Sequence, residues 1–292
     1  MTVCCVVVFG EWLAAEPPTT PRKWKSLSFR AQRSVAKNRK TIPANSNYSL
    51  LFTFFNMDII IDDPIREQEF RQILTKIRLA KNGETVAQMK EHGLVYKMNW
   101  GVSIIQLREI ASQFTPNHLL ALKLWNKQWR ETMILAAMLD VPKEVTEEQM
   151  DYWTKSLETA EIAEALNTYL WAKTKFAFIK ALEWCRGKKH LVRFAGLHLM
   201  GRLALTEKSA MDEFFEPFFD ILSPLAKDPN LKQIFYRSFI LLGTKGKTMN
   251  ERAILFAEGL KELDSEESEI LAEMILSELK SEYVQDLFVK NT

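Results

Sequence analysis

Residues 175–200, KFAFIKALEWCRGKKHLVRFAGLHLM, contain the two helical patterns that decide the fold. In 175–185, apolar residues recur at i, i+3 and i+4, the spacing of one helix face. The segment 190–200 is apolar almost all round, which is typical of a buried helix. Gly187 interrupts the pattern between them. We therefore expect a helix, a short turn and a second helix that neighbours enclose.

The helical period persists from Pro64 to the end of the chain, with breaks at glycine, proline and asparagine residues. Thr146, followed by Glu147 and Glu148, supplies a helix start with acidic residues in the first turn. No segment of strand length alternates convincingly between apolar and polar residues. Helix pairs recur at roughly 35–45 residues, the spacing of HEAT-like repeats. We predict an all-α, HEAT-like helical-repeat solenoid, with a non-repetitive helical bundle as the alternative.

Composition narrows the class of protein. Of 292 residues, 47% are apolar and 26% are charged, as in ordinary globular proteins. No apolar run approaches the roughly 20 residues that cross a membrane. Cys4, Cys5 and Cys185 have neither metal-ligand spacing nor a disulfide framework. We expect a cytoplasmic monomer in a reducing compartment, with no metal and no membrane.

The first 56 residues do not follow the helical pattern. Residues 17–49 mix Pro, Ser, Thr and basic side chains without periodicity, as disordered segments do. The apolar run 3–10 has no basic region before it, so it makes a poor signal peptide. One hypothesis is a basic arm that binds nucleic acid or acts as an organellar address; the other, which we favour, is that Met57 is the natural start. We predict a single solenoid domain over residues 57–292.

The net charge of +2 conceals an uneven distribution. Residues 58–292 hold 31 basic and 35 acidic side chains, a balance of −4. Within them, residues 171–250 hold fourteen Lys or Arg against seven acids, and residues 251–292 hold four against eleven. A chain with a positive middle and a negative end can present one basic face to a polyanion.

Three segments stand in a characteristic order: WGVSIIQLREIA (100–111), LALKLWNKQWRETMILAAMLDVPKEVTEEQMDYW (120–153) and KFAFIKALEWCRGKKHLVRFAGLHLMGRLAL (175–205). Their order and spacing resemble the DNA alkylation repair family of AlkD-like glycosylases. The resemblance implies HEAT-like repeats that form a C-shaped basic groove around double-stranded DNA. It also implies excision of cationic alkylpurines such as 3-methyladenine and 7-methylguanine, without any cofactor.

The resemblance also places the family's site residues. The family's catalytic helix reads Trp-Asp-x-x-Asp, and on that register this chain reads Ala160-Glu161-Ile162-Ala163-Glu164. It implies that Glu164 is the carboxylate that stabilises the developing sugar cation, and that Arg193 supports it or contacts a phosphate. Ala160 stands where the family has a tryptophan that stacks on the lesion. A second family aromatic falls close to Arg237.

This chain differs from the family pattern at Glu164, where the family has aspartate, and at Ala160, where it has tryptophan, and both differences affect the chemistry. Cleavage of an N-glycosidic bond builds positive charge on the sugar, which a fixed carboxylate stabilises most in the transition state. Glutamate carries that charge on a longer arm, and a displacement of about 1 Å can cost on the order of a hundredfold in rate. Loss of an aromatic face removes a cation–π contact worth roughly 0.5–2 kcal/mol. This pattern is compatible with weak excision.

We predict a DNA-contacting surface centred on residues 171–193 and 237–247. Its candidate contacts are Lys173, Lys175, Lys188, Lys189, Arg237, Lys245 and Lys247. The leading hypothesis is a monofunctional N-glycosylase. One alternative is a protein that binds DNA shape without excision. The other is a helical scaffold for proteins, and the net charge of −4 over residues 58–292 favours this second alternative. For the individual residues, the competing interpretations are solvated lysines, a solvated acidic helix face and a structural ion pair at Arg193.

Overall fold

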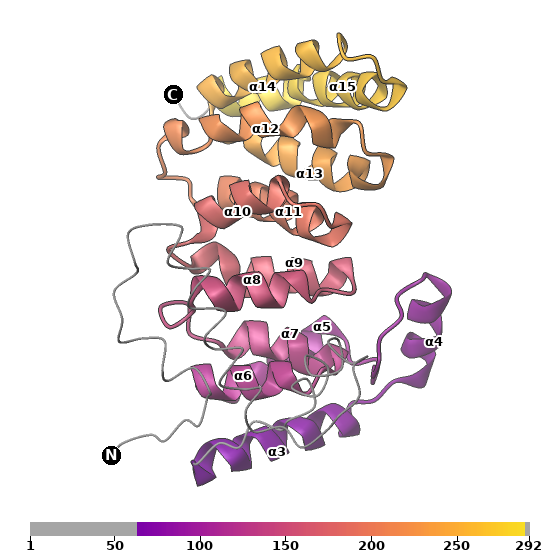
Figure 1. Ribbon diagram of the computed structural model, residues 1–292, viewed down its shortest axis with the longest axis vertical. Coiled ribbons are helices and arrows are strands. Elements are labelled where there is room, and N and C mark those ends of the chain that lie inside the picture. The colour runs from indigo at the N-terminus through magenta and orange to yellow at the C-terminus, as the bar shows by residue number, and fades with distance from the viewer. Residues whose placement is uncertain (1–62, 290–292) are drawn as a thin grey trace, which may run out of the picture. The chain divides into compact units, whose positions relative to one another are not determined.

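The computed structural model describes residues 63–289, and these residues form helices and no strands (Figure 1). Contacts within the chain separate residues 1–67 from residues 68–292. The described part of the first unit is Asp63 and the first turn of α3 (Pro64–Leu79). The predicted boundary between residues 56 and 57, and the hypotheses on the segment before it, lie outside the described residues.

The second unit contains the other elements. In chain order they are α4 (Gly83–Glu91), α5 (Ile104–Ala111), α6 (His118–Asn126), α7 (Arg130–Leu139), α8 (Glu147–Lys155), α9 (Ala160–Tyr169), η1 (Trp171–Lys173), α10 (Ala177–Cys185), α11 (His190–Thr206), η2 (Asp212–Phe214), α12 (Glu216–Ala226), η3 (Pro229–Leu231), α13 (Lys232–Gly243), α14 (Lys247–Leu260), α15 (Glu266–Leu279) and α16 (Glu282–Val289). The all-α prediction is confirmed. Among the described residues, no helix is long and apolar enough to cross a membrane.

Five helices of the second unit pack side by side in the order α7, α9, α11, α13 and α15 (Figure 1). We call this set the principal layer. Helices α6, α10 and α14 pack against α7, α11 and α15, and α10 also contacts α12. Three pairs of consecutive helices, α6–α7, α10–α11 and α14–α15, thus each have one member in the principal layer.

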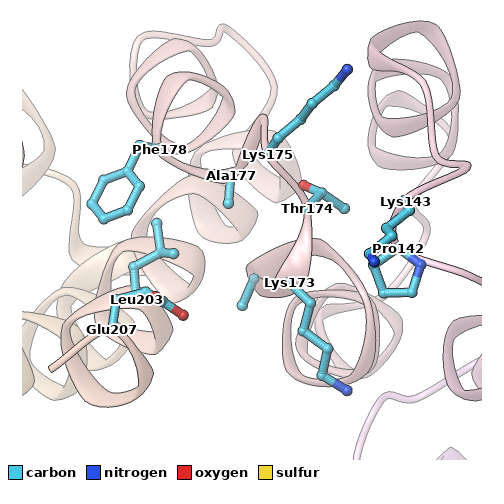
Figure 2. Close-up of a pocket in the computed structure, with 10 residues that line it drawn as sticks. Pro142, Lys143, Lys173, Thr174, Lys175, Ala177, Phe178, Leu203 and Glu207 are labelled. Carbon is cyan, nitrogen blue, oxygen red and sulfur yellow. The ribbon is translucent and has the colours of Figure 1, made fainter. Parts of the chain in front are cut away.

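Helices α10 and α11 run antiparallel. Ala177, at the start of α10, and Leu203, near the end of α11, line the same pocket (Figure 2). At the other end of the pair, residues 186–189 make a short turn between the two helices. The predicted helix–turn–helix over 175–200 is therefore confirmed.

Two glycines allow α11 to approach its neighbours closely. A Cβ atom at Gly196 would lie 2.6 Å from the backbone nitrogen of Cys185 in α10. A Cβ atom at Gly201 would lie 2.8 Å from the Cα atom of Ser238 in α13. Both distances are shorter than any real Cβ contact. Because any larger residue would push the helices apart, the glycines fix the position of α11 at the centre of the stack.

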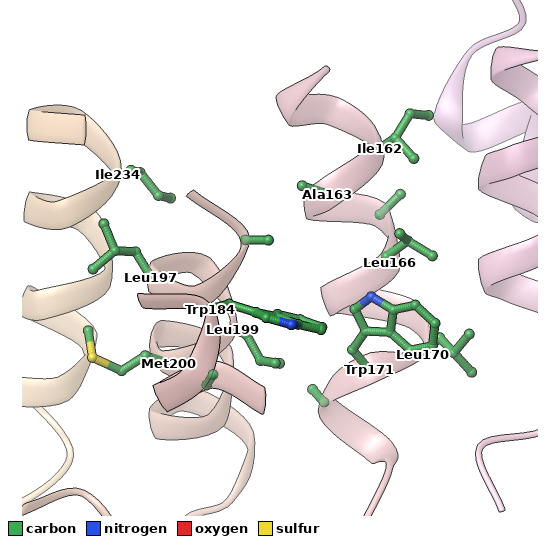
Figure 3. Packing of buried hydrophobic residues seen from close by; sticks show 14 of the residues in the cluster. Ile162, Ala163, Leu166, Leu170, Trp171, Trp184, Leu197, Leu199, Met200 and Ile234 are labelled. Atoms are coloured by element: carbon green, nitrogen blue, oxygen red, sulfur yellow. The ribbon is translucent and has the colours of Figure 1, made fainter. Parts of the chain in front are cut away.

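The core between the layers is built from large apolar side chains. Trp171 and Trp184 lie between α9 and the α10–α11 pair (Figure 3) and are 1% and 3% exposed. The rings of Trp125 and Trp153 are stacked, with centroids 4.2 Å apart. These four tryptophans therefore fill the space between helices. Each fully buried leucine nearby, such as Leu166, contributes roughly 1.5–3 kcal/mol.

Helix starts follow the sequence signals. The Thr146 side chain accepts a hydrogen bond from the backbone N–H of Gln149 at 3.2 Å, so the predicted start of α8 is confirmed. Ser103 and Gln106 form a capping box at the start of α5. At α9 the side chain of the preceding Thr159 does not cap the helix; its hydroxyl donates to the oxygen of Tyr96. This exception leads to the candidate site.

Candidate nucleic-acid interface

Glu161 and Glu164 project from α9 but have different surroundings. Glu161 is bound by Arg130 of α7, whose Nε and Nη2 atoms lie 2.8 and 2.5 Å from the two carboxylate oxygens. The Tyr96 hydroxyl also donates to Glu161, and Thr159 donates to the Tyr96 oxygen at 3.0 Å. Paired contacts of this kind are the strong form of an Arg–carboxylate interaction. The negative charge of Glu161 is therefore stabilised by contacts within the protein.

The pKa values agree with this geometry. Burial acts to raise the pKa of Glu161, but the hydrogen bonds and charge of Arg130 outweigh it, so this pKa lies below its ordinary value. Burial, followed by the negative charge of Glu161, raises the pKa of Tyr96. At neutral pH, Tyr96 is a neutral donor and Glu161 is a charged acceptor.

The other side of the Arg130 guanidinium connects α7 to the segment before α5. Its Nη1 atom donates to the Val102 carbonyl at 2.9 Å and lies 3.2 Å from Glu131 Oε1. The same oxygen accepts the backbone N–H groups of Trp100 and Val102 at 3.1 and 3.3 Å. Glu131 is 0% exposed, so its charge depends on these contacts.

Sequence reasoning did not single out Arg130 or Glu131. The signal that could have identified them is a pair of adjacent opposite charges inside the apolar stretch WRETMILAAML (129–139). Buried charges need partners, so such a pair predicts an internal ion cluster.

Glu164 is the accessible carboxylate of α9. Its side chain is 37% exposed, and its partner is Arg237 of α13, whose Nη1 atom lies 3.4 Å from Glu164 Oε1. Arg237 is itself 56% exposed. An ion pair this exposed contributes about 0–1 kcal/mol. The structure thus brings together the predicted catalytic carboxylate and one predicted DNA contact from a different helix.

Arg193 is partly exposed, although the helix that carries it, α11, is largely buried. Its side chain is 34% exposed, its Nε atom donates to the Gly187 carbonyl at 2.6 Å, and its Nη1 atom lies 3.9 Å from Asp228. A long arginine side chain can leave an apolar helix while its stem stays in contact with it. The expected support of Glu164 by Arg193 is not formed, because Glu164 pairs with Arg237 instead.

His198 is a hydrogen-bonded histidine of the core. The Nδ2 atom of Asn167 lies 3.1 Å from His198 Nδ1 and donates to the Ala195 carbonyl at 2.9 Å. Burial, followed by the charges of Arg202 and Arg237, lowers the pKa of His198 to about 4. The charges of Arg202 and Arg237 therefore act on His198 inside the core.

The predicted lysine contacts do not form one cluster. Lys173 and Lys175 lie in the connection between α9 and α10, and Lys247 lies at the start of α14. Lys188 and Lys189 lie in the turn between α10 and α11. Because α10 and α11 are antiparallel, the α9–α10 connection and the α10–α11 turn lie at opposite ends of the helices. All five residues are exposed.

Lys245 differs from the other predicted contacts. Its side chain is 6% exposed, and its ammonium group donates to the Ala210 carbonyl at 2.7 Å and to Asp212 at 3.0 Å. It also lies 5.2 Å from the centroid of the Phe215 ring. The charge of Lys245 links the α11–α12 connection to the α13–α14 connection, a structural role that does not fit the predicted DNA contact.

Comparison with known proteins identifies a matching sequence family and a similar solved structure. The sequence profile of the family described as DNA alkylation repair enzyme matches residues 73–233. A solved structure is similar over 65% of this chain and 82% of its own, with a TM-score of 0.58 and 15% sequence identity. It is described as a new family of proteins related to the HEAT-like repeat DNA glycosylases, with affinity for branched DNA structures. No curated protein matches the sequence. The predicted resemblance and the HEAT-like fold are confirmed.

Proposed function

Because the chain belongs to the DNA alkylation repair enzyme family, we propose that it binds double-stranded DNA across the principal layer without excising a base. The observation that carries this proposal is the ion pair between Glu164 and Arg237. It places a protein cation beside the carboxylate that would have to stabilise a cationic sugar.

Electrostatics explains why this arrangement disfavours excision. A glycosidic bond breaks faster when negative charge is fixed where positive charge develops. Arg237 offsets the charge of Glu164 in the ground state, and its guanidinium would repel a cation that forms beside Glu164. Because both side chains are exposed to solvent, that repulsion is on the order of 1 kcal/mol, or about fivefold in rate.

Recognition of a cationic base is also weakened. Ala160 begins α9, one turn before Glu164, so it presents a methyl group where the family has an indole. The missing cation–π contact is worth roughly 0.5–2 kcal/mol. The other aromatic position of the family falls close to Arg237, which is positively charged. A neutral or anionic group suits this surface better than a methylated, cationic purine.

Binding of DNA itself is supported by the unpaired basic groups. Lys188 and Lys247 are exposed and have no ion-pair partner among the described residues. Arg202 also lacks an acidic partner within residues 63–289, and its charge, like that of Arg237, acts on His198. Phosphate contacts from such groups position DNA without reading its sequence. We therefore propose recognition of DNA shape, with branched DNA as the preferred form, in line with the similar solved structure.

The test measures binding and excision separately. Fluorescence anisotropy with a linear duplex and a four-way junction should show affinity for both, with tighter binding of the junction and a steep loss with salt. Methylated duplex DNA incubated with the protein should release no alkylpurine, whereas heating the same DNA releases it chemically and shows that the lesions were present. Absence of DNA binding at low salt would support the protein-scaffold alternative.

Excision is the second candidate function, favoured by the exposure of Glu164 and by its single 3.4 Å contact. A surface pair of this kind is weak enough for a substrate to displace. Release of alkylpurine by the wild-type protein, with loss of that release in Glu164→Gln, would establish excision and overturn the first proposal.

A further inference from the structure

A pocket of about 470 Å³ lies beside the connection between α9 and α10 (Figure 2). Three parts of the chain line it: the α7–α8 connection, residues 172–178, and the last turn of α11 with the residue after it. The lining residues are Pro142, Lys143, Ala172, Lys173, Thr174, Lys175, Ala177, Phe178, Leu203 and Glu207. The ion pairs of Glu161 and Glu164 involve none of them.

The pocket has an apolar side and a cationic side. Phe178, Leu203 and Ala177 gather on one side in Figure 2, whereas Lys143 lies opposite them. Phe178 also contacts Phe214 and Phe215, with ring centroids 5.5 and 5.2 Å away, so its ring is held by neighbours. The apolar side therefore offers a fixed aromatic and aliphatic surface of the kind that binds a planar ring.

The charged groups of the pocket are available to a ligand. Lys143 and Lys173 have no ion-pair partner among the described residues, and the Lys175 ammonium lies 4.8 Å from the centroid of the Phe176 ring without an acidic partner there. The lining holds three lysines and one acid, Glu207, a balance of +2. The Thr174 hydroxyl donates to the Trp171 carbonyl at 2.9 Å, so its proton is not available to a ligand. The remaining donors suit an anion.

We propose that this pocket binds a nucleoside monophosphate unit, with the base against Phe178 and Leu203 and the phosphate beside Lys143. The long side chains of Lys173 and Lys175, which point away from each other in Figure 2, would turn toward that phosphate. Lysine is an established phosphate ligand, and organic ligands occupy pockets of about 300–1,000 Å³. An inorganic phosphate alone would leave the apolar side unused. An unphosphorylated nucleoside would leave the lysines unused.

Two sources can supply this chemistry. One is an unpaired, 5′-phosphorylated nucleotide at the end of a DNA strand, an option that rests on the proposed function. The other is a free mononucleotide, which does not. The pocket lies at the end of the helices opposite Lys188 and Lys189, so a strand that reaches it would leave the duplex bound across the principal layer.

The experiment uses the full chain and two charge-matched variants. One carries Lys143→Met, Lys173→Met and Lys175→Met. The other removes the same charge elsewhere, through Lys81→Met, Lys90→Met and Lys97→Met, at three exposed positions with no ion pair among the described residues. Methionine keeps the apolar stem of lysine. Calorimetric titrations use dAMP, deoxyadenosine and inorganic phosphate, and anisotropy compares a duplex that carries a 5′-phosphorylated single-stranded end with the blunt duplex.

We expect dAMP to bind the wild-type protein more tightly than deoxyadenosine or phosphate does. The pocket variant should lose at least about tenfold in dAMP affinity, the loss expected for one charge-assisted hydrogen bond, and the control should retain it. If only the single-stranded end shows this lysine dependence, the source is a DNA strand. If the pocket variant and the control behave alike with dAMP and with the single-stranded end, the inference is overturned. Binding of the blunt duplex reports separately on the proposed function.

Discussion

Replacement of Arg130 by methionine is the sharpest test of how α9 is positioned. Arg130 is 3% exposed and contacts two carboxylates, one of which, Glu131, is 0% exposed. Its removal leaves Glu131 with only backbone donors and Glu161 with only the Tyr96 hydroxyl. Removal of one partner from a buried ion pair costs about 3–5 kcal/mol because the remaining charge is uncompensated. We expect Arg130→Met to lower the free energy of unfolding by that amount.

Urea unfolding measures this loss. With a slope of about 2–3 kcal/mol per molar urea for a chain of this size, the midpoint should fall by about 1–2 M. The double variant Arg130→Met, Glu161→Gln completes a mutant cycle with Glu161→Gln. We expect a coupling energy of roughly 0.5–3 kcal/mol between residues 130 and 161. A coupling energy near zero, with a midpoint shift of a few tenths molar, would show that the ion cluster does not hold α9.

The pH dependence gives an independent check. The folded-state pKa of Glu161 lies below its ordinary value of 4.5, so its ion pair stabilises the protein above pH 4.5 and that stability is lost as the pH falls through the folded-state pKa. Arg130→Met removes this contribution. The difference in stability between wild type and variant should therefore shrink in acid, and a difference that is constant from pH 7 to 3 would contradict the assignment.

Three further predictions concern the centre of the stack and its basic turn. Because burial lowers the pKa of His198 from 6.5 to about 4, the unfolded state binds the proton first, and the protein should lose up to about 3 kcal/mol as the pH falls from 6.5 to 4; His198→Leu should abolish this component in urea titrations. Gly196→Ala should cost about 1–3 kcal/mol in urea unfolding because its Cβ would meet Cys185, and an unchanged midpoint would exclude the close approach. The double variant Lys188→Ala, Lys189→Ala should weaken binding of all DNA sequences alike and reduce the salt slope by about 2, whereas an unchanged slope would remove this turn from the interface.

The elements of the fold follow from the sequence because their causes are local. Apolar residues at helical spacing and cap residues such as Thr146 act within a few positions of the chain. The enclosed position of α11 was also predictable, because a helix that is apolar all round needs neighbours on every side. The recurrence of helix pairs at roughly 35–45 residues predicted their stacking, and the resemblance to a known family agreed with it.

The contacts of the site could not be predicted in the same way. Glu161 and Glu164 have identical chemistry and three-residue spacing, yet one is bound to Arg130 and the other pairs with Arg237. Which carboxylate meets which arginine depends on the rotation of α9 relative to α7 and α13, a tertiary property. Arg193 shows the same limit, because the length of its side chain, and not the apolarity of its helix, determines where its charge lies.

The contrast between α11 and α4 has a consequence for the order in which the structure opens. α11 has ten buried residues and packs against α8, α9, α10 and α13, whereas α4 has none. Amide hydrogens exchange with solvent when a segment opens, and segments with few buried contacts open at low free energy. Deuterium uptake should therefore reach completion in α4 long before it begins in the middle of α11. Partial unfolding of α4 would then leave the surface formed by α9, α11 and α13 intact, so α4 is a part of the chain that can tolerate change.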